Sequence, residues 1–264
     1  MVRFLSGLTS QGTRRAARRP AGSVDDGPIE RREDGAQGGG TDADPGSERS
    51  AAEVLAQIDR MMVHVVALVG EAIAGATHAL LAGDREAAKH LMARDDLVDE
   101  QITAITALTQ HRLVAGQGTQ AERAELVAVL RMLPDLDRNG DLAAHIARRA
   151  ARGLGAEMSP RSRGLVERMG EVASAIWSST ADAVSDRSVQ AANVVDALDD
   201  EMDELHVGLT AELATGTMPV PVAIELAMIG RFYERFGDHA VSLARRMSAL
   251  GKDGAPEPRR SAAD

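Results

Sequence analysis

Four pairs of carboxylates, each pair spaced four residues apart, are the residues of this sequence best suited to do chemistry. The pairs are Asp95/Asp99, Asp137/Asp141, Asp199/Asp203 and Glu234/Asp238. On a helix this spacing places both side chains of a pair on one face, with Cβ atoms about 5–6 Å apart. Oxygen ligands from two adjacent helices suit Mg²⁺, Mn²⁺ or Ca²⁺, and iron is feasible, whereas zinc is less natural with few histidines. The spacing indicates cation binding, although a solvated acidic face explains any single pair equally well.

Three of the pairs place one acid on or beside an apolar stripe of its predicted helix. These acids are Asp95, Asp137 and Asp199. Because a carboxylate on a packing face needs a compensating partner, an arginine or a bound cation must neutralise it. Arg138 and Arg235 directly follow the first acid of their pairs and point away from it on an ideal helix. Since neither arginine can simply pair with both acids, a hard cation is the second source of compensation.

The acidic pattern occurs twice in the chain. Residues 95–100 and 199–204 both read Asp-Asp-x-x-Asp-Glu, at an offset of 104. Residues 137–141 align with residues 234–238 at an offset of 97, and an Ala-Arg-Arg string recurs after both. Two matches in the same order predict a duplicated unit.

The segment between Ser50 and Gly251 consists mostly of helix-forming residues, and breakers divide it about every 30 residues. Thr119 and Glu122 form a capping-box pattern, Ser159 caps a helix with proline at its first position, and Pro134 predicts a kink. The predicted helices span about 51–81, 85–115, 120–152, 160–184, 185–215 and 219–250. Short loops between long helices predict an all-α fold of two tandem three-helix bundles, residues 51–155 and 156–251.

The two ends of the chain differ from this helical body. Residues 1–50 carry nine glycines, three prolines and few apolar residues, and residues 252–264 are rich in proline, arginine and alanine. Segments with so little apolar surface cannot offset the entropy of ordering, so we expect disordered tails at both ends.

Composition excludes several classes of site. The absence of cysteine rules out disulfides, zinc–thiolate sites and cysteine nucleophiles. A net charge of −10 and an aromatic content of 2% disfavour binding to nucleic acid. The negative charge also disfavours anionic membranes, and no uncharged apolar run has the length that we expect of a membrane span.

The sequence contains no motif for a nucleophilic serine, a phosphate-binding glycine loop or a zinc protease. A ferritin-like di-iron site needs two Glu-x-x-His motifs. Asp203 and His206 supply one Asp-x-x-His, but the corresponding Asp99 and Ile102 do not. We therefore predict no catalytic residues and a regulatory protein, with a metal-dependent helical-bundle enzyme as the alternative. His145 and His239 are weaker ligand candidates beside the acidic motifs.

Residues 232–240, Phe-Tyr-Glu-Arg-Phe-Gly-Asp-His-Ala, resemble the L-E-R-I-G-D-H-A motif of the PhoU family of phosphate-uptake regulators. Residues 136–143, Leu-Asp-Arg-Asn-Gly-Asp-Leu-Ala, are similar to the same motif, with Asn139 in place of an apolar residue. The Asp95/Asp99 and Asp199/Asp203 pairs resemble the acids of the family's second helices. The likeness extends over about residues 51–250, including the duplication.

The resemblance implies two pseudo-two-fold-related bundles with multinuclear metal clusters, often of iron, while Mg²⁺, Mn²⁺ and Zn²⁺ stay open. It assigns Asp95, Asp99, Asp137 and Asp141 to one cluster, and Asp199, Asp203, Glu234 and Asp238 to the other. The implied role is negative regulation of phosphate uptake and of phosphate-starvation signalling. The implied partners are the ATPase subunit of the phosphate ABC transporter and a phosphate-sensing histidine kinase.

The resemblance further implies a cytoplasmic location and a homodimer, whereas the charge and composition given above predict neither nucleic-acid binding nor direct membrane insertion. A metal-free adaptor, in which the acids form a docking surface for a basic partner, stays open as an alternative reading of the same residues.

Overall fold

A computed structural model describes residues 51–116 and 118–253 of the chain. The disordered tail predicted for residues 1–50 lies outside these residues, as do residues 254–264 of the second predicted tail. Residues 252 and 253 still belong to the last helix, so that helix extends two residues into the predicted tail.

Seven α-helices and one short 3₁₀ helix make up the described part of the chain, in which no strand occurs. They are α1 (Ala51–Ala82), α2 (Arg85–Met92), α3 (Asp95–Val114), α4 (Gln120–Ala151), η1 (Leu154–Glu157), α5 (Pro160–Asp186), α6 (Val189–Ala214) and α7 (Val220–Asp253). The all-α fold class predicted from the sequence is confirmed.

The helix ends follow local chemistry that the sequence displays. The Thr119 hydroxyl accepts from the Glu122 N–H, and the Glu122 carboxylate accepts from the Thr119 N–H, which completes the predicted capping box. The Asp84 side chain caps α2 and the Ser159 side chain caps α5, each by accepting from backbone N–H groups of the first turn. Four of the predicted stops are glycines with positive φ, at positions 83, 116, 153 and 216. Such φ values favour glycine because it lacks a Cβ.

Two predicted boundaries were wrong. The single helix expected over residues 85–115 is interrupted at Ala93 and Arg94, between α2 and α3. Both residues are good helix formers, so their types do not explain this break. At the break the Arg94 guanidinium reaches Glu71 on α1, with N···O 3.2 Å. Helix α6 begins at Val189 rather than near residue 185, because Arg187 adopts a left-handed φ of 53° and Ser188 is the N-cap.

The proline for which a kink was predicted, Pro134, lies inside one continuous helix, α4, which runs from Gln120 to Ala151. Pro134 lacks an N–H, so one intrahelical hydrogen bond is missing at this point. Its ring is exposed, and the helix continues past it.

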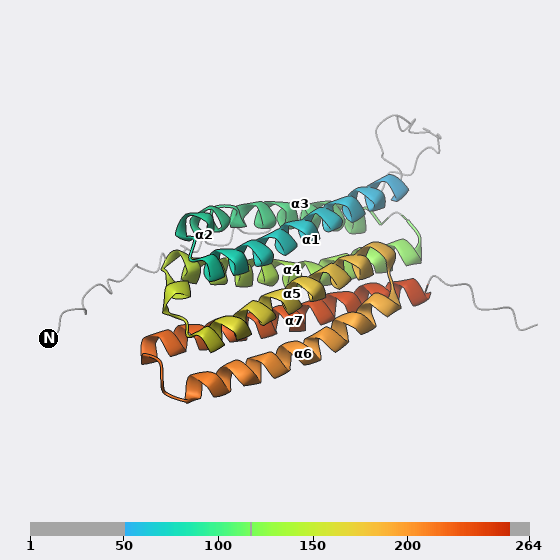
Figure 1. Cartoon of the computed structure of the whole chain (residues 1–264). Helices are drawn as coiled ribbons and strands as arrows, with labels where there is room; N and C mark the ends of the chain where they lie inside the picture. The colour runs from blue at the N-terminus through green and yellow to red at the C-terminus, as the bar shows by residue number, and fades with distance from the viewer. Residues whose placement is uncertain (1–50, 117, 254–264) are drawn as a thin grey trace, which may run out of the picture. The chain divides into compact units, whose positions relative to one another are not determined.

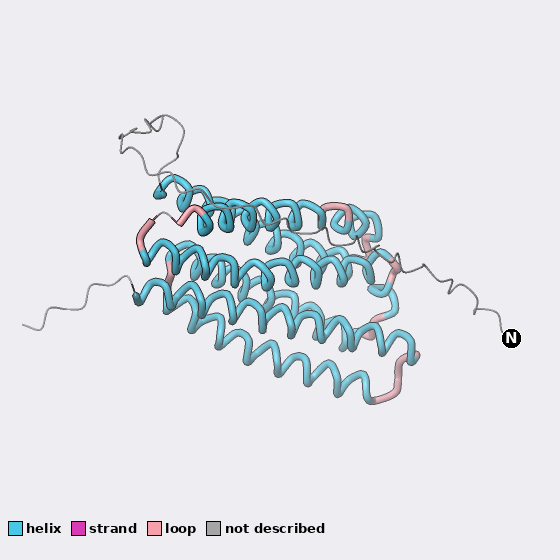
Figure 2. Tube along the Cα trace, turned by 180° about the vertical axis from the view of Figure 1, so that it is seen from behind, coloured by secondary structure: helices cyan, strands magenta, loops and turns pink. Residues whose placement is uncertain are grey.

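The helices form two three-membered groups that lie side by side (Figure 1). In the first group α1 packs on α4, and the α2–α3 segment covers both. In the second group α5 packs on α7, and α6 covers both. The groups meet where α4 contacts α7 and α1 contacts α5, which leaves α3 and α6 on opposite outer sides (Figures 1 and 2).

Aromatic residues join the two groups. The Trp177 indole Nε1–H donates to the Val66 carbonyl oxygen at 2.6 Å, and its ring lies 4.9 Å from the Phe236 ring, centroid to centroid. The buried Tyr233 hydroxyl lies 2.7 Å from the Thr77 hydroxyl oxygen. Gly70 permits this packing, since a Cβ there would lie 2.8 Å from Trp177 Cδ1. The aromatic residues in the described part of the chain are therefore concentrated where the repeats meet.

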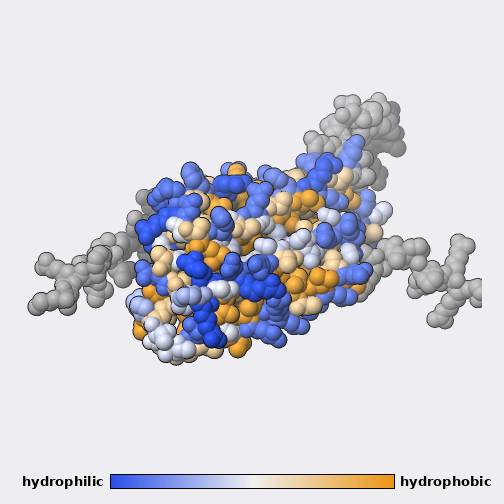
Figure 3. Space-filling view, in the orientation of Figure 1, coloured by the Kyte–Doolittle hydropathy of each residue, from blue (hydrophilic) through white to orange (hydrophobic). Residues whose placement is uncertain are grey.

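One helix of the described chain is long and apolar enough to be compared with a membrane span. Residues Glu53–Ala82 of α1 have the length and mean apolar character of a membrane-spanning helix. Its apolar residues pack in the shared core, including Ile58, Val65, Ile73 and Leu80, none of which is exposed. Burial against α4 and α5 therefore accounts for the composition of α1. On the face seen in Figure 3, hydrophilic and hydrophobic residues are intermixed rather than separated into bands.

Candidate metal centres

The four acids predicted for the second centre lie on two helices that pack against each other, α6 and α7. Asp199 and Asp203 lie on α6, and Glu234 and Asp238 lie on α7. Burial raises the pKa of Asp199 to about 6, and the negative charges of Asp203, Asp238 and Glu234 add to this effect. The charges of both helices therefore lie within electrostatic range of Asp199.

Gly237 explains how Asp199 can lie so close to α7. A Cβ at this position would overlap Oδ1 of Asp199 and would lie 3.6 Å from Cδ1 of Ile176. The glycine between Glu234 and Asp238 therefore leaves the space that the acid of the neighbouring helix occupies. The sequence motif contains this glycine, but only the packing shows which side chain needs it.

Glu234 has one oxygen available for a ligand. Its Oε1 pairs with the Arg231 guanidinium, whereas its Oε2 is buried and has no hydrogen-bond partner in the described chain. The side chain is 14% exposed, and burial together with the charge of Asp238 raises its pKa. A buried carboxylate oxygen without a partner is costly, and a cation is one group that would satisfy it. The donor set of this centre thus fits a hard cation.

The first centre shows the same arrangement between α3 and α4. Burial raises the pKa of Asp137, and the neighbouring Asp99 and Asp141 raise it further, in part through a hydrogen bond between the carboxyl groups of Asp99 and Asp137. Asp95 is the first residue of α3, directly after the interruption of the predicted helix. The structure therefore brings Asp99 of α3 near Asp137 and Asp141 of α4, whereas the side chain of Asp95 lies outside the described part of the chain.

The arginine and asparagine of the first motif have other partners. Arg138 pairs with Asp135 one turn earlier, with N···O 3.5 Å, so it is directed away from Asp137 as predicted. Asn139 is fully buried, and its Nδ2 donates to the Phe236 carbonyl oxygen at 3.3 Å. It therefore joins the two repeats and does not extend the first centre.

The two weaker histidine candidates also lie at the contact between the repeats. His145 Nδ1 lies 2.6 Å from the Asp141 backbone oxygen, and its ring packs against Phe232. His239 Nδ1 lies 2.8 Å from Asn139 Oδ1. In the sequence, His206 was considered only as half of a ferritin-like Asp-x-x-His motif, whereas in the structure it lies on α6 close enough to Glu234 of α7 to interact with its charge.

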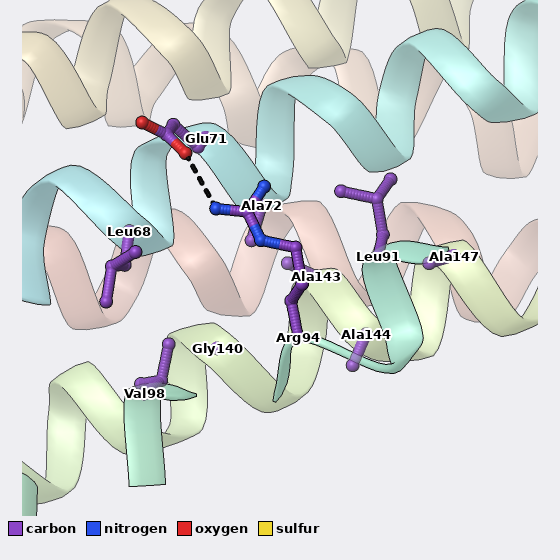
Figure 4. A pocket seen from close by; sticks show the side chains of 10 residues that line it. All are labelled: Leu68, Glu71, Ala72, Leu91, Arg94, Val98, Gly140, Ala143, Ala144 and Ala147. Atoms are coloured by element: carbon purple, nitrogen blue, oxygen red, sulfur yellow. Dashed lines mark hydrogen bonds and ion pairs between the residues drawn. The ribbon is translucent and has the colours of Figure 1, made fainter. Parts of the chain in front are cut away.

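A small pocket lies next to the α2–α3 interruption (Figure 4). It encloses about 30 Å³, enough for about one or two waters. Arg94 reaches across its edge to Glu71, and the other lining residues are mostly apolar. The pocket therefore belongs to the packing of α1 to α4 and offers no space for a larger ligand.

In the described residues, no three histidine or acidic side chains already converge in a geometry that would hold a metal ion. Carboxylates without a cation between them repel one another, which favours rotamers that spread them apart. The assignment of the eight acids as ligands stays a prediction.

Comparison with known proteins identifies the family. The family model described as the PhoU domain matches residues 62–150 and 166–247, which fall within the two helical groups. The chain belongs to the PhoU family. PhoU proteins are regulatory accessory proteins and not a family of enzymes, so the prediction that this chain is not an enzyme is confirmed.

Curated relatives cover most of the helical region. The chain is 30% identical over 213 residues to the "phosphate-specific transport system accessory protein PhoU homolog 1" of Mycobacterium leprae, covering 78% of this chain and 94% of that protein. It is 31% identical over 202 residues to PhoU homolog 2 of Mycobacterium tuberculosis, covering 74% and 93%. The crystal structure of PhoU from Pseudomonas aeruginosa matches with a TM-score of 0.72 at 23% identity, over 77% of this chain and all of that chain. This last likeness supports the tandem-bundle fold.

Proposed function

We propose that this protein is a cytoplasmic negative regulator of phosphate uptake and phosphate-starvation signalling. In this proposal it is a homodimeric adaptor between the ATPase subunit of the phosphate ABC transporter and a phosphate-sensing histidine kinase. Membership of the PhoU family supports a role in phosphate transport, because the curated relatives are accessory proteins of the phosphate-specific transport system. An adaptor of this kind regulates by binding one state of a partner more tightly than the other.

We further propose that the adaptor binds metal ions at two centres, with iron favoured and Mg²⁺, Mn²⁺ or Zn²⁺ as the other options. The observation that supports this most strongly is the buried Oε2 of Glu234, which has no hydrogen-bond partner among the described residues and lies within electrostatic range of Asp199, Asp203 and Asp238. Asp199, Asp203, Glu234 and Asp238 would hold one ion or cluster, and Asp95, Asp99, Asp137 and Asp141 the other. A bound cation would neutralise these carboxylates and cross-link the two helices of each centre.

The exposure of the acids suggests how metal loading reaches a partner. Asp203 and Asp238 are exposed, whereas Asp199 and Glu234 are partly buried. Loading the second centre therefore changes the charge of a surface on α6 and α7, as well as the rigidity of their contact. Both changes alter affinity for a protein that docks on this surface.

Complementation of a deletion strain tests the function. We expect deletion of the gene to raise phosphate uptake and to switch on a phosphate-starvation reporter in phosphate-rich medium. The wild-type gene should reverse both effects, and the D199N/E234Q variant should not. A matched control is E167Q/D182N, which removes the same charges from exposed positions on α5.

The outcomes separate the alternatives. Unchanged uptake and signalling after deletion would contradict the regulatory role. Full complementation by D199N/E234Q would contradict the metal-dependent part and favour the metal-free acidic adaptor. In that case, partner binding should weaken steeply with salt, since exposed charges are screened within about 8–10 Å at physiological ionic strength.

A further inference from the structure

The two proposed centres differ at one position that the duplication makes directly comparable. At the offset of 104 that aligns the two acidic strings, His206 in the second repeat corresponds to Ile102 in the first. Both residues follow the second acid of their helix by three positions, so each lies on the same helical face as that acid. One repeat thus has a nitrogen donor at a position where the other has a hydrocarbon.

The ring of His206 lies against α7, close to the acids of that helix. Gly230, one turn before Glu234, allows this approach, because a Cβ there would lie 3.2 Å from His206 Cδ2. His206 is also near enough to Glu234 to interact with its charge, and its side chain is partly buried. The ring is therefore held between the two helices that carry the second set of acids.

Ile102 has different surroundings in the first repeat. It lines an open groove between α3 and α4 together with Thr106, Leu130, Leu133 and Asp137. The two histidines near the acidic motifs are engaged elsewhere, His145 with Phe232 and His239 with Asn139. Among the described residues, the first centre consequently has oxygen donors alone.

We propose that His206 is a nitrogen ligand of the second centre and makes the two centres select different cations. This inference rests on the metal binding proposed above. Imidazole favours borderline ions such as Fe²⁺, Co²⁺ and Zn²⁺, whereas an all-oxygen site favours Mg²⁺ and Ca²⁺. Imidazole adds a ligand without adding negative charge, so it completes coordination without increasing the repulsion among the four acids. The second centre is the transition-metal site, and the first is the site for hard, weakly bound ions.

Pulsed EPR tests the ligand directly, because a coordinated imidazole gives a ¹⁴N coupling. The protein is loaded with less than one equivalent of Mn²⁺ in the presence of excess Ca²⁺, which occupies the all-oxygen first centre. The variant H206Q removes the nitrogen donor, and H111Q, at an exposed histidine on α3, is the matched control. We expect the ¹⁴N coupling in wild type and H111Q and its loss in H206Q. We also expect Zn²⁺ affinity, measured by competition with a chromophoric chelator, to fall at least about tenfold in H206Q. Mg²⁺ affinity should change less.

The converse variant I102H places an imidazole in the first centre. We expect it to add a second Zn²⁺ site of raised affinity in a D199N/E234Q background, where the second centre is disabled. Circular dichroism and thermal unfolding of each variant establish that the fold is intact before metal is added.

The outcomes distinguish this inference from the proposed function on which it rests. Mn²⁺ bound without ¹⁴N coupling in wild type, or with coupling that persists in H206Q, would overturn the role of His206 and leave the metal centres standing. Failure of folded wild-type protein to bind Mn²⁺ or Zn²⁺ at all would overturn both proposals.

Discussion

At Gly237, helix stability favours alanine, whereas the geometry of the second centre favours glycine. In a helix interior, glycine is about 1 kcal/mol less favourable than alanine, so Gly237→Ala would stabilise an isolated α7. In the folded protein a Cβ there overlaps Oδ1 of Asp199. Overpacking of this kind costs typically about 1–3 kcal/mol. Because Asp199 can rotate away, we expect an overpacking cost in the lower half of that range, about 1–2 kcal/mol. The gain of about 1 kcal/mol in helix propensity offsets part of this cost, so the free energy of unfolding should fall by less than about 1 kcal/mol.

The same substitution should weaken metal binding by more than it weakens the fold. Moving the Asp199 carboxylate takes it away from Glu234 and Asp238, and small displacements of supporting groups typically cost metal sites about 10–100-fold in affinity. Urea unfolding in the presence of chelator measures the first effect, and chelator competition measures the second.

Gly164→Ala is the matched control for this experiment. Gly164 is exposed on α5, and a Cβ there would meet no atom of the described chain within 4 Å. We expect it to stabilise the protein by about 1 kcal/mol and to leave metal affinity unchanged. If Gly237→Ala behaves like Gly164→Ala in both assays, the packing of Asp199 against Gly237 has no role in the centre.

Three further predictions concern stability. The fold raises the pKa of Asp199 from 3.8 to about 6, so the folded metal-free protein binds this proton more tightly, and its stability should fall as pH rises from about 4 to about 6. The unscreened shift corresponds to about 3 kcal/mol, which partial exposure reduces to about 1 kcal/mol. Urea unfolding at several pH values should therefore show that the free energy of unfolding falls by about 1 kcal/mol less between about pH 4 and about pH 6 in Asp199→Asn than in the wild type. An equal fall in both proteins would contradict the prediction. Arg246→Met removes the 2.8 Å ion pair to Asp135, whose side chain is 10% exposed, and should cost about 2 kcal/mol. Thermal unfolding checks this loss, which adding Asp135→Asn should largely reverse; a fully stable single variant would refute the reasoning. Thr119→Ala removes the capping box of α4 and should lower the free energy of unfolding by about 1 kcal/mol, so an unchanged urea midpoint would count against it.

Local signals in the sequence predicted most of the fold. Thr119, Ser159 and Asp84 cap helices in the structure because their side chains accept from N–H groups within the first turn, which depends on neighbouring residues alone. The glycine stops are local for the same reason. The duplication was visible because the two acidic strings recur in the same order.

Features that depend on tertiary contacts were not predicted. Residues 93 and 94 favour helix, yet the chain breaks there where Arg94 reaches Glu71 on another helix. Arg187 takes a left-handed conformation that its type does not favour, and its guanidinium pairs with Glu125 of α4. Such long-range contacts override weak local preferences, and no pattern within a short window encodes them.

For the candidate site as well, local features were predicted from the sequence, and features that depend on a neighbouring helix were not. The i, i+4 spacing of acids predicted which side chains share a helical face, and the pairing of α6 with α7 and of α3 with α4 brought these faces together. The roles of Gly237 and His206 appear only when the neighbouring helix is in place. Asn139 is a further example, since its partner Phe236 is 97 residues away in the chain.

The metal content of protein purified without chelator tests the proposed centres most directly. Elemental analysis of the wild type should find iron, or else manganese, magnesium or zinc, and D199N/E234Q should lose much of it. The control E167Q/D182N should retain the wild-type content. A wild-type protein that is metal-free, and that stays so after iron, manganese, magnesium and zinc are added, would contradict the metal centres and reduce the eight acids to a charged surface.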